Sequence, residues 1–332
     1  MLQTKYAAKM GVLRSLMVLA CTLLGFLPGP ASAAYPEQPI TMIVAYAPGG
    51  GTDLVARAIA PYIEKYLGDG ARIIVLNRTG AGGEIGFAAL ASAPHDGYTI
   101  GFINTPPVLT IPIERKTAFT WKSLDLLGNI VDDPGNFSVH AESPFKNLAD
   151  LAAYAKANPN AVSVGTTGSG SDDHLAMVLF ERIAGVKMNH IPFKGSADVR
   201  TALAGKQIVV GAINVGEALQ YAKGGSPMRN LGQMSQVRTV LAPDLPTFKE
   251  QGYDIELAAL RGLAAPKGLP PAIRERLIKA IEQAVADPGF HLQAAKFYAP
   301  LRYLPPAKYE AELRAAEAQF RQLWNDMPWI DK

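Results

Sequence analysis

Apolar and polar positions follow two different periods along the chain after residue 35. Short apolar runs at 40–46, 72–76 and 98–103 predict strands, and amphipathic stretches at 52–67 and 84–92 predict helices between them. Apolar runs at 126–131 and 137–140 predict two further strands. The strand–helix order is typical of a mostly parallel sheet with helices on both faces.

The same alternation begins again near residue 143. We expect helices at 148–158, 171–184, 197–204 and 218–223, and strands at 162–165, 189–192 and 208–213. A turn-rich segment at 241–246 leads back to the first unit, followed by a strand at 261–265 and helices at 271–286 and 307–325. We therefore predict an α/β protein of two lobes, lobe 1 at 34–140 and 250–332 and lobe 2 at 141–249. The crossovers near 138–143 and 241–258 are the expected hinges, with a ligand cleft between the lobes.

Residues 1–33 have the order of a secretory signal peptide. Lys5, Lys9 and Arg14 precede an apolar run at 16–27, and Ala31-Ser32-Ala33 follows as a small-x-small cleavage signal. We expect export to the periplasm and cleavage after residue 33. A lipoprotein remains the alternative, because Cys21 ends a segment that loosely resembles a lipobox.

Removing this signal changes what the composition implies. Three of the 32 Lys and Arg residues lie in it, so the mature chain has 29 basic and 29 acidic residues. The apparent basicity belongs to the signal, and a nucleic-acid partner loses its support. The mature chain has no cysteine, which excludes a disulfide framework and thiol chemistry.

Four glycine-containing loops lie where a predicted strand gives way to a helix. They are 48–53, 80–83, 166–171 and 194–196, two from each predicted lobe. A helix N-terminus presents unpaired N–H groups, and glycine lets an anion come close to them. Taken singly, such a loop can be structural, with Thr52 or Ser171 as an N-cap. Four together predict a site for a small anion held largely by backbone amides.

The spacings argue against nucleotides and catalysis. No Gly-Lys-Ser/Thr follows the first loop, and Gly80, Gly82 and Gly86 give G-x-G-x-x-x-G, one residue too long for a dinucleotide site. Ser169 has Thr167 and Ser171 where a nucleophile elbow needs glycine. We therefore expect a carboxylate ligand, no cofactor, no metal and no enzymatic activity. Asp172 and Asp173 are expected to favour the helix dipole, and His174 either contacts the ligand or is structural.

An ordered set of motifs spans nearly all of the mature chain. It includes Tyr35-Pro36-Glu37-Gln38-Pro39, Pro48-Gly49-Gly50-Gly51-Thr52-Asp53, Asn77-Arg78-Thr79-Gly80-Ala81-Gly82-Gly83, Asp96-Gly97-Tyr98, Gly168-Ser169-Gly170-Ser171, Phe193-Lys194-Gly195-Ser196 and Ala265-Pro266-Lys267-Gly268. In order and spacing these motifs resemble the tripartite tricarboxylate transporter receptors, the Bug family of periplasmic binding proteins.

The resemblance implies a type II Venus-flytrap fold that binds a carboxylate, partly through ordered waters, and delivers it to a membrane permease. The candidate ligand-binding residues are Tyr46, Pro48, Gly51, Thr52, Asp53, Ala81, Gly82, Gly83, Thr105, Thr166, Ser169, Gly170, Ser171, His174, Lys194, Gly195 and Asn214. The loop 104–107 and the strand end 211–214 differ from the sequence usual in this family, so the ligand's identity stays open.

Three functions remain in competition. The first is a monomeric periplasmic solute-binding protein for a small carboxylate, with a dicarboxylate of four to six carbons as the expected ligand because both lobes carry anion-binding loops. The second is a periplasmic sensor with the same pocket and a different docking surface. The third is a hydrolytic enzyme on the same two-lobed fold, for which the sequence offers no paired nucleophile and base.

Overall fold

A computed structural model describes residues 35–68 and 70–330, so the predicted signal peptide lies outside the described residues. In this part of the chain ten strands form one hydrogen-bonded sheet, eight of them in a single path and two pairing beside it. They are β1 (Ile40–Val44), β2 (Ile73–Asn77), β3 (Thr99–Thr105), β4 (Leu124–His140), β5 (Ser163–Thr166), β6 (Asn189–Pro192), β7 (Val210–Asn214), β8 (Met228–Gln233), β9 (Ala258–Pro266) and β10 (Leu301–Leu304).

The strands pair in two groups that meet at β4. In the first group β1 pairs in parallel with β2 and β3, and β9 lies antiparallel between β3 and β4. In the second group β5 pairs in parallel with β6 and β7, while β7 and β8 run antiparallel to β4. The parallel pairs are those the strand–helix alternation predicts. The structure adds antiparallel pairs along β4 and β9, which makes the sheet mixed.

Strand β4 is continuous where the sequence predicted two strands. It pairs with β9 as far as Pro134, opposite Ala258, and with β7 from Gly135, opposite Asn214. The turn-forming sequence at 132–136 suggested a break, but ladder bonds to two different partners keep the segment extended. The change of partner therefore falls at Pro134–Gly135, a few residues before the crossover expected at 138–143.

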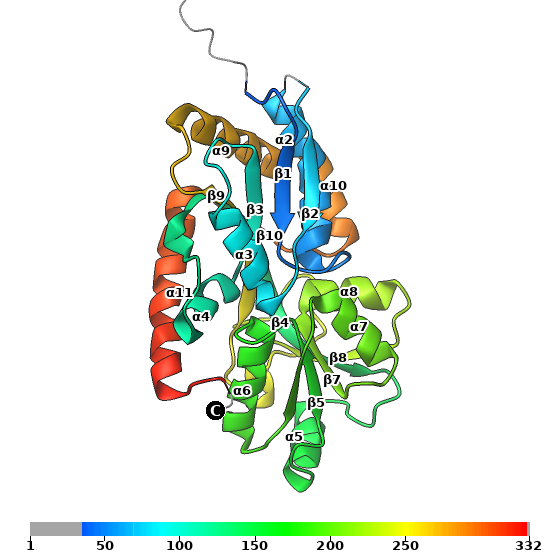
Figure 1. Cartoon of the computed structure of the whole chain (residues 1–332). Helices are drawn as coiled ribbons and strands as arrows, with labels where there is room; N and C mark the ends of the chain where they lie inside the picture. Colours follow the sequence, from blue (N-terminus) through cyan, green and yellow to red (C-terminus); the bar gives the residue numbers. More distant parts are fainter. Residues whose placement is uncertain (1–34, 69, 331–332) are drawn as a thin grey trace, which may run out of the picture. The chain divides into compact units, whose positions relative to one another are not determined.

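The helices follow the strands largely as expected, with two additions. They are α2 (Gly51–Leu67), α3 (Glu84–Ala91), α4 (Pro107–Glu114), α5 (Leu148–Ala157), α6 (Asp172–Ala184), α7 (Ser196–Ala204), α8 (Val215–Lys223), α9 (Pro271–Ala286), α10 (Pro288–Lys296) and α11 (Pro306–Asp326). Helices α4 and α10 and strands β8 and β10 were not anticipated from the sequence. Figure 1 shows α11 running alongside α4, and α2 lying against α9.

Local side-chain chemistry fixes several helix starts. Asn147 accepts a hydrogen bond from the Asp150 amide at 2.8 Å and caps α5. Ser171 accepts from the His174 amide at 3.2 Å and caps α6. Helix α8 begins with a capping box between Asn214 and Glu217. These caps fix where α6 and α8 begin, and both helix starts contribute to the site described below.

Each strand group packs against a large apolar cluster of its own. One packs Phe87, Ile111 and Tyr309 beneath the first group, and the other packs Phe137 and Phe180 beneath the second. Among the described residues, no helix is long and apolar enough to cross a membrane.

Candidate functional site

A small cavity of about 30 Å³ lies where helix starts from both strand groups converge. We call it the inner cavity. It is lined by the start of α2 at Gly51 and Thr52, by Asn104 at the end of β3, by Asp172 and Glu217 at the starts of α6 and α8, and by Arg261 of β9. The predicted site residues Tyr46, Thr105 and Asn214 also line it.

The N-terminus of α2 already holds a carboxylate of the chain itself. The Gly51 amide donates to Glu217 Oε1 at 2.8 Å, and the Ser196 hydroxyl donates to the same oxygen at 2.8 Å. Arg261 Nη2 lies 3.2 Å from that oxygen as well. The backbone N–H and the helix dipole therefore act on Glu217 as the sequence predicted they would act on a ligand anion, and the Arg261 guanidinium adds to them.

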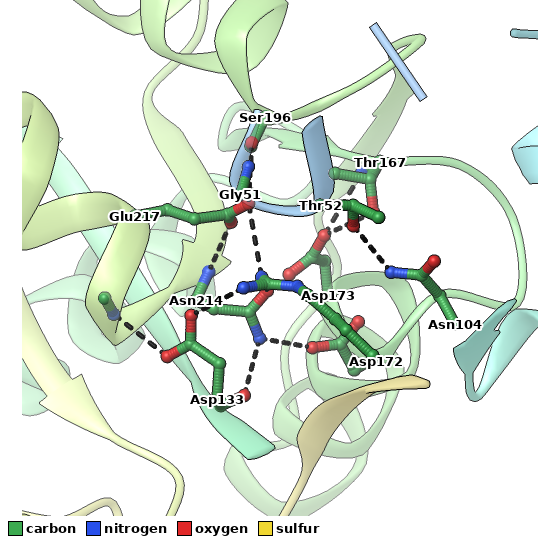
Figure 2. Close-up of polar contacts among 12 residues, drawn as sticks. Gly51, Thr52, Asn104, Asp133, Thr167, Asp172, Asp173, Ser196, Asn214 and Glu217 are labelled. Carbon is green, nitrogen blue, oxygen red and sulfur yellow. Dashed lines mark hydrogen bonds and ion pairs between the residues drawn. The ribbon is translucent and has the colours of Figure 1, made fainter. Parts of the chain in front are cut away.

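Arg261 joins this carboxylate to a buried polar network (Figure 2). Its Nη1 pairs with Asp133 Oδ2 at 3.2 Å, and its Nη2 donates to Asn214 Oδ1 at 3.0 Å. The side-chain Nδ2 of Asn214 in turn donates to Asp172 Oδ2 at 2.7 Å. Asp133 also accepts from the Gly216 amide at 2.9 Å. One chain of bonds thus connects α2, β4, α6, α8 and β9.

Carboxyl groups outnumber cations in this network. Asp133, Asp172, Asp173, Glu217 and Arg261 are each less than one-tenth exposed. Burial raises the pKa of Asp133 to about 7 and that of Asp172 to about 6. Burial, followed by the charge of Asp172, raises the pKa of Asp173 well above its usual range. The cluster therefore carries more negative charge than Arg261 alone can balance, and it retains protons near neutral pH.

Four buried polar atoms in and beside this cavity lack a partner among the described residues, namely the acceptors Asn104 Oδ1 and Asp173 Oδ1 and the possible donors Thr105 Oγ1 and Arg261 Nε. Asn104 Nδ2 donates to Thr52 Oγ1 at 2.8 Å, but Asn104 Oδ1 has no hydrogen-bond partner among the described residues. Asp173 Oδ2 accepts from the Thr167 amide and hydroxyl, whereas Asp173 Oδ1 likewise has no partner in the described part of the chain. Buried acceptors of this kind are costly unless a donor reaches them.

A second, larger cavity of about 320 Å³ lies beside two of the glycine loops. We call it the outer cavity. It is lined by Gly80, Ala81, Gly82, Gly83, Arg115, Thr167, Gly168, Ser169, Pro192, Phe193 and Lys194. The two loops approach closely, because a Cβ at Gly168 would lie 2.7 Å from the Gly82 Cα. Gly82 and Gly168 also have positive φ angles of 69° and 125°, a second reason for glycine there.

The remaining predicted site residues line neither of these cavities. Asp53 accepts from the Gly49 amide and pairs with Arg57, and exposed Pro48 precedes it. Ser171 is the α6 N-cap. Gly195 packs against Ala47, since a Cβ at Gly195 would lie 3.1 Å from the Ala47 nitrogen.

His174 has structural partners around its ring. Its Nδ1 accepts from the Gly170 amide at 3.1 Å, and its ring stacks on His190 at 3.9 Å. Thr166 Oγ1 lies 2.7 Å from His190 Nε2. Burial lowers the pKa of His174 to about 3, so the neutral ring serves as an acceptor. His174 lines a separate surface cavity near the end of the chain.

Sequence reasoning missed the residues that dominate the inner cavity, namely Asp133, Ser196, Glu217 and Arg261. A signal existed for two of them. Asn214 and Glu217 have the spacing of a capping box, and Arg261 is a lone charge inside the apolar run of β9. Nothing in the sequence indicated that these residues and Asp133 would meet.

The fold and site define a two-lobed periplasmic binding protein, as predicted. The computed structure is similar to the one titled "Structure of periplasmic binding protein BugD", with a TM-score of 0.82 and 31% identity over 88% of this chain and 98% of that one. It is also similar to "R. palustris Rpa4515 with adipate", with a TM-score of 0.82 and 25% identity over 88% of this chain and 97% of that one.

The family follows from the sequence comparisons. The family model described as "Tripartite tricarboxylate transporter family receptor" matches residues 55–300. The chain is also 33% identical over 304 residues to the "UPF0065 protein in gbd 5'region" of Cupriavidus necator, covering 90% of this chain and 91% of that protein. The chain belongs to the tripartite tricarboxylate transporter receptor family, which confirms the resemblance found in its motifs.

Proposed function

We propose that this protein is exported to the periplasm, captures a small carboxylate there as a monomer, and delivers it to a tripartite tricarboxylate-type membrane permease. The role is binding rather than catalysis. The family and the solute-binding proteins it resembles support this proposal. The adipate named for one similar structure supports a ligand of four to six carbons, the size expected from the sequence.

The observation that carries the proposal is the outer cavity. Two glycine loops, 80–83 and 168–170, meet there at the starts of α3 and α6. Lys194 supplies an exposed ammonium on the same lining, while the Arg115 guanidinium there already pairs with Glu84 at 2.7 Å and Glu114 at 2.8 Å. Backbone amides beside helix N-termini together with the Lys194 ammonium suit a carboxylate, with ordered waters completing its hydrogen bonds.

The outer cavity is a better place for the ligand's carboxylate than the start of α2. The sequence led us to expect that carboxylate at the Gly51 amide. Glu217 already accepts from this amide and from Ser196, and Arg261 lies beside it. A ligand anion there would have to expel a buried carboxylate that has three favourable partners.

A thermal-shift screen of mono-, di- and tricarboxylates and aromatic acids tests the proposal. A ligand at one hundred times its Kd should stabilise the folded state by about 2.7 kcal/mol. Replacing Lys194 with Met should then weaken binding of the best ligand about 10-fold, the effect of losing a charge-assisted hydrogen bond. The control Lys308→Met changes an exposed lysine on α11 and should bind normally. Normal binding by Lys194→Met would place the carboxylate elsewhere.

A further inference from the structure

A cavity of about 390 Å³ lies on the first strand group and shares no lining residue with the inner or the outer cavity. We call it the basic cavity. It is formed by the short 3₁₀ helix η3 (Trp121–Ser123), the start of β4, the loop after β9 and the first turns of α9 and α11. The proposed carboxylate site therefore uses none of its residues.

Cationic side chains outnumber carboxylates on its lining. The cations are Lys122, Lys267, Arg274 and Arg314, and the carboxylates are those of Asp125 and Glu310. After removal of the predicted signal peptide, the chain as a whole has 29 basic and 29 acidic residues, so this excess is local. A local positive excess on a chain without net charge suits an anionic partner at that place.

The loop after β9 presents one of these cations in a fixed position. It contains the motif Ala265-Pro266-Lys267-Gly268, which lines neither the inner nor the outer cavity. Asp125 Oδ2 accepts from the Gly268 amide at 2.8 Å and from the Leu269 amide at 3.0 Å. Asp125 Oδ1 lies 3.0 Å from Lys267 Nζ. The buried carboxyl group thus holds the loop, and the loop places Lys267 at the cavity.

The Trp121 ring positions two more of the cations. Lys122 Nζ lies 5.4 Å and Arg314 Cζ lies 5.6 Å from its centroid. The ring is buried, and its Nε1 donates to Glu317 Oε2 at 2.8 Å. Lys122 also lies 3.3 Å from that oxygen, and Arg314 lies 2.7 Å from Glu310. Cation–π contacts with a fixed ring hold both charges beside the cavity.

These three cations stay accessible although each has a carboxylate of the chain beside it. The side chain of Lys122 is 59% exposed, and those of Lys267 and Arg314 are each 64% exposed. Exposed ion pairs contribute little to stability, because water and salt screen them. A carboxylate of a partner can therefore join or replace the chain's own at little cost.

Arg274 is the cation with donors to spare. Its Nη2 donates to the Leu126 carbonyl at 3.4 Å, and it makes no ion pair within residues 35–68 and 70–330. A guanidinium has five N–H donors in a planar fork, which suits the two oxygens of a carboxylate. The side chain is half-buried in the first turn of α9, so its position is restricted before a partner arrives.

The distribution of charge favours a protein segment over a lipid surface or a small anion. Four cations from four segments, three of them largely exposed, suit several carboxylates spread along a chain better than one anion. Attachment to a membrane surface also needs exposed apolar side chains on the same face. Of the large apolar side chains that are exposed in the described part of the chain, none lines this cavity.

Resting on the proposed delivery of a carboxylate to a permease, we propose that the basic cavity is the docking surface for an acidic periplasmic segment of that membrane partner. Lys122, Lys267, Arg274 and Arg314 bind its carboxylates. Because the basic cavity shares no residue with the ligand cavities, docking leaves the bound carboxylate in place.

Calorimetry on the mature protein tests the chemistry of this surface. The probe is a capped peptide of alternating glutamate and serine, and its control has glutamine in place of every glutamate. We expect the acidic peptide to bind at least ~10-fold more tightly than the glutamine peptide at low salt, and added salt should weaken its binding.

The double variant Lys122→Glu/Arg314→Glu should weaken binding of the acidic peptide at least ~10-fold, because it replaces attraction with repulsion. Arg274→Gln is the milder variant, since glutamine can still donate to the Leu126 carbonyl, and it should weaken binding about 3- to 10-fold. The matched control Lys146→Glu/Lys296→Glu reverses two exposed lysines outside the cavity and should bind as wild type. All these variants should keep wild-type affinity for the best carboxylate of the thermal-shift screen.

Uptake of that carboxylate by cells tests docking to the permease itself. Cells that carry Lys122→Glu/Arg314→Glu in place of the wild-type chain should take it up at least ~10-fold more slowly at equal periplasmic protein levels. The control pair should support normal uptake. Slow uptake together with normal carboxylate binding separates docking from ligand capture.

Normal uptake with Lys122→Glu/Arg314→Glu overturns the docking inference and leaves the carboxylate function standing. Unchanged peptide affinity in both cavity variants places the acidic segment elsewhere and also overturns it. Binding to phosphatidylglycerol vesicles that is tighter than binding to the peptide, and is lost in the double variant, assigns the cavity to a membrane surface instead. A wild-type protein that binds no carboxylate in the screen overturns the proposed function and the docking inference with it.

Discussion

Glu217 shows how a single residue changes the use of a helix N-terminus. Its Oε1 accepts from Gly51 and Ser196 and pairs with Arg261. Its Oε2 accepts from the backbone N–H of Asn214 at 3.2 Å. The same side chain is the acidic partner of the α8 capping box. Glu217 therefore fixes the start of α8, and it also occupies the N–H group at the start of α2 that a ligand anion would otherwise use.

At the residue scale, the first prediction concerns Gly51. A Cβ there would overlap Glu217 Oε1 and lie 2.8 Å from Arg261 Nη1. Gly51→Ala should displace the carboxylate from its partners, lower the free energy of unfolding by about 1–3 kcal/mol and weaken ligand binding at least ~10-fold. Urea unfolding and calorimetry measure the two effects.

A glycine with open surroundings provides the control for that substitution. Gly224 ends α8 with φ −74°, and the nearest atom to its added Cβ lies at 3.4 Å. Gly224→Ala should change the free energy of unfolding by no more than about 0.5 kcal/mol. An equally small effect of Gly51→Ala would show that Glu217 does not depend on its contact with α2.

The second residue-scale prediction is a pH dependence of stability. Burial raises the folded-state pKa of Asp172 from 3.8 to about 6. A raised carboxyl pKa stabilises the folded state below pH 4, and this stabilisation is lost as the pH rises toward 6. Relative to wild type, Asp172→Asn should therefore gain about 2 kcal/mol in free energy of unfolding between pH 4 and pH 7.

His174 contributes with the opposite sign, because burial lowers its pKa to about 3 and its charging in the unfolded state favours unfolding below pH 6.5. This contribution is common to wild type and Asp172→Asn, so it cancels in their difference. Denaturant unfolding from pH 4 to pH 8 provides the measurement. A difference that stays constant with pH would mean that Asp172 has an ordinary pKa in the folded protein.

At the element scale, contacts join the loop before α2 to helices α7 and α8. The Tyr221 hydroxyl of α8 donates to the Gly49 carbonyl at 3.0 Å and lies 3.1 Å from Ser196 Oγ. The Ala47 amide donates to the Lys194 carbonyl at 3.2 Å. These contacts connect the two strand groups near the inner cavity, and they are among those that would break if the groups separated as lobes.

We expect Tyr221→Phe to weaken ligand binding about 3- to 10-fold, because it removes the Gly49 hydrogen bond without changing the ring. If the strand groups move as lobes about β4 and β9, the ligand-free variant should also have a larger radius of gyration than ligand-free wild type. Calorimetry and small-angle scattering measure these quantities. Tyr154→Phe, on a half-exposed ring of α5, is the control.

An unchanged affinity in Tyr221→Phe would remove that hydroxyl from the mechanism. A radius of gyration that is the same with and without saturating ligand in wild type would count against closure in solution. The change of β4 partner at Pro134–Gly135 would then be a feature of the sheet without a hinge function.

At the scale of the whole molecule, export determines which chain folds. We predict cleavage after Ala33, so mass spectrometry of the periplasmic protein should show a start at Ala34 or Tyr35. Substituting bulky residues at Ala31 and Ala33 should leave an uncleaved precursor, since the peptidase site requires small side chains. A mature protein that begins with lipid-modified Cys21 would instead identify a membrane-anchored lipoprotein.

The sequence alone determined most of the elements, the fold class and the family. Strand and helix periods depend on neighbours a few residues apart, so the chain from 40 to 286 could be divided largely as the structure has it. The glycine loops also follow from local chemistry, because turn geometry at a helix start depends on the residues of that turn. Of the residues named from these loops, Ala81, Gly82, Gly83, Ser169 and Lys194 line the outer cavity, and their role in ligand binding stays a prediction.

Only the tertiary structure decided the charge of the inner cavity. Asp133, Asp172, Glu217 and Arg261 come from β4, α6, α8 and β9, and no local pattern indicates that they meet. The continuity of β4 is non-local for the same reason, since its two halves are held by different partner strands. Burial then raises the pKa values of Asp133 and Asp172, because desolvation depends on the packing of distant segments around them.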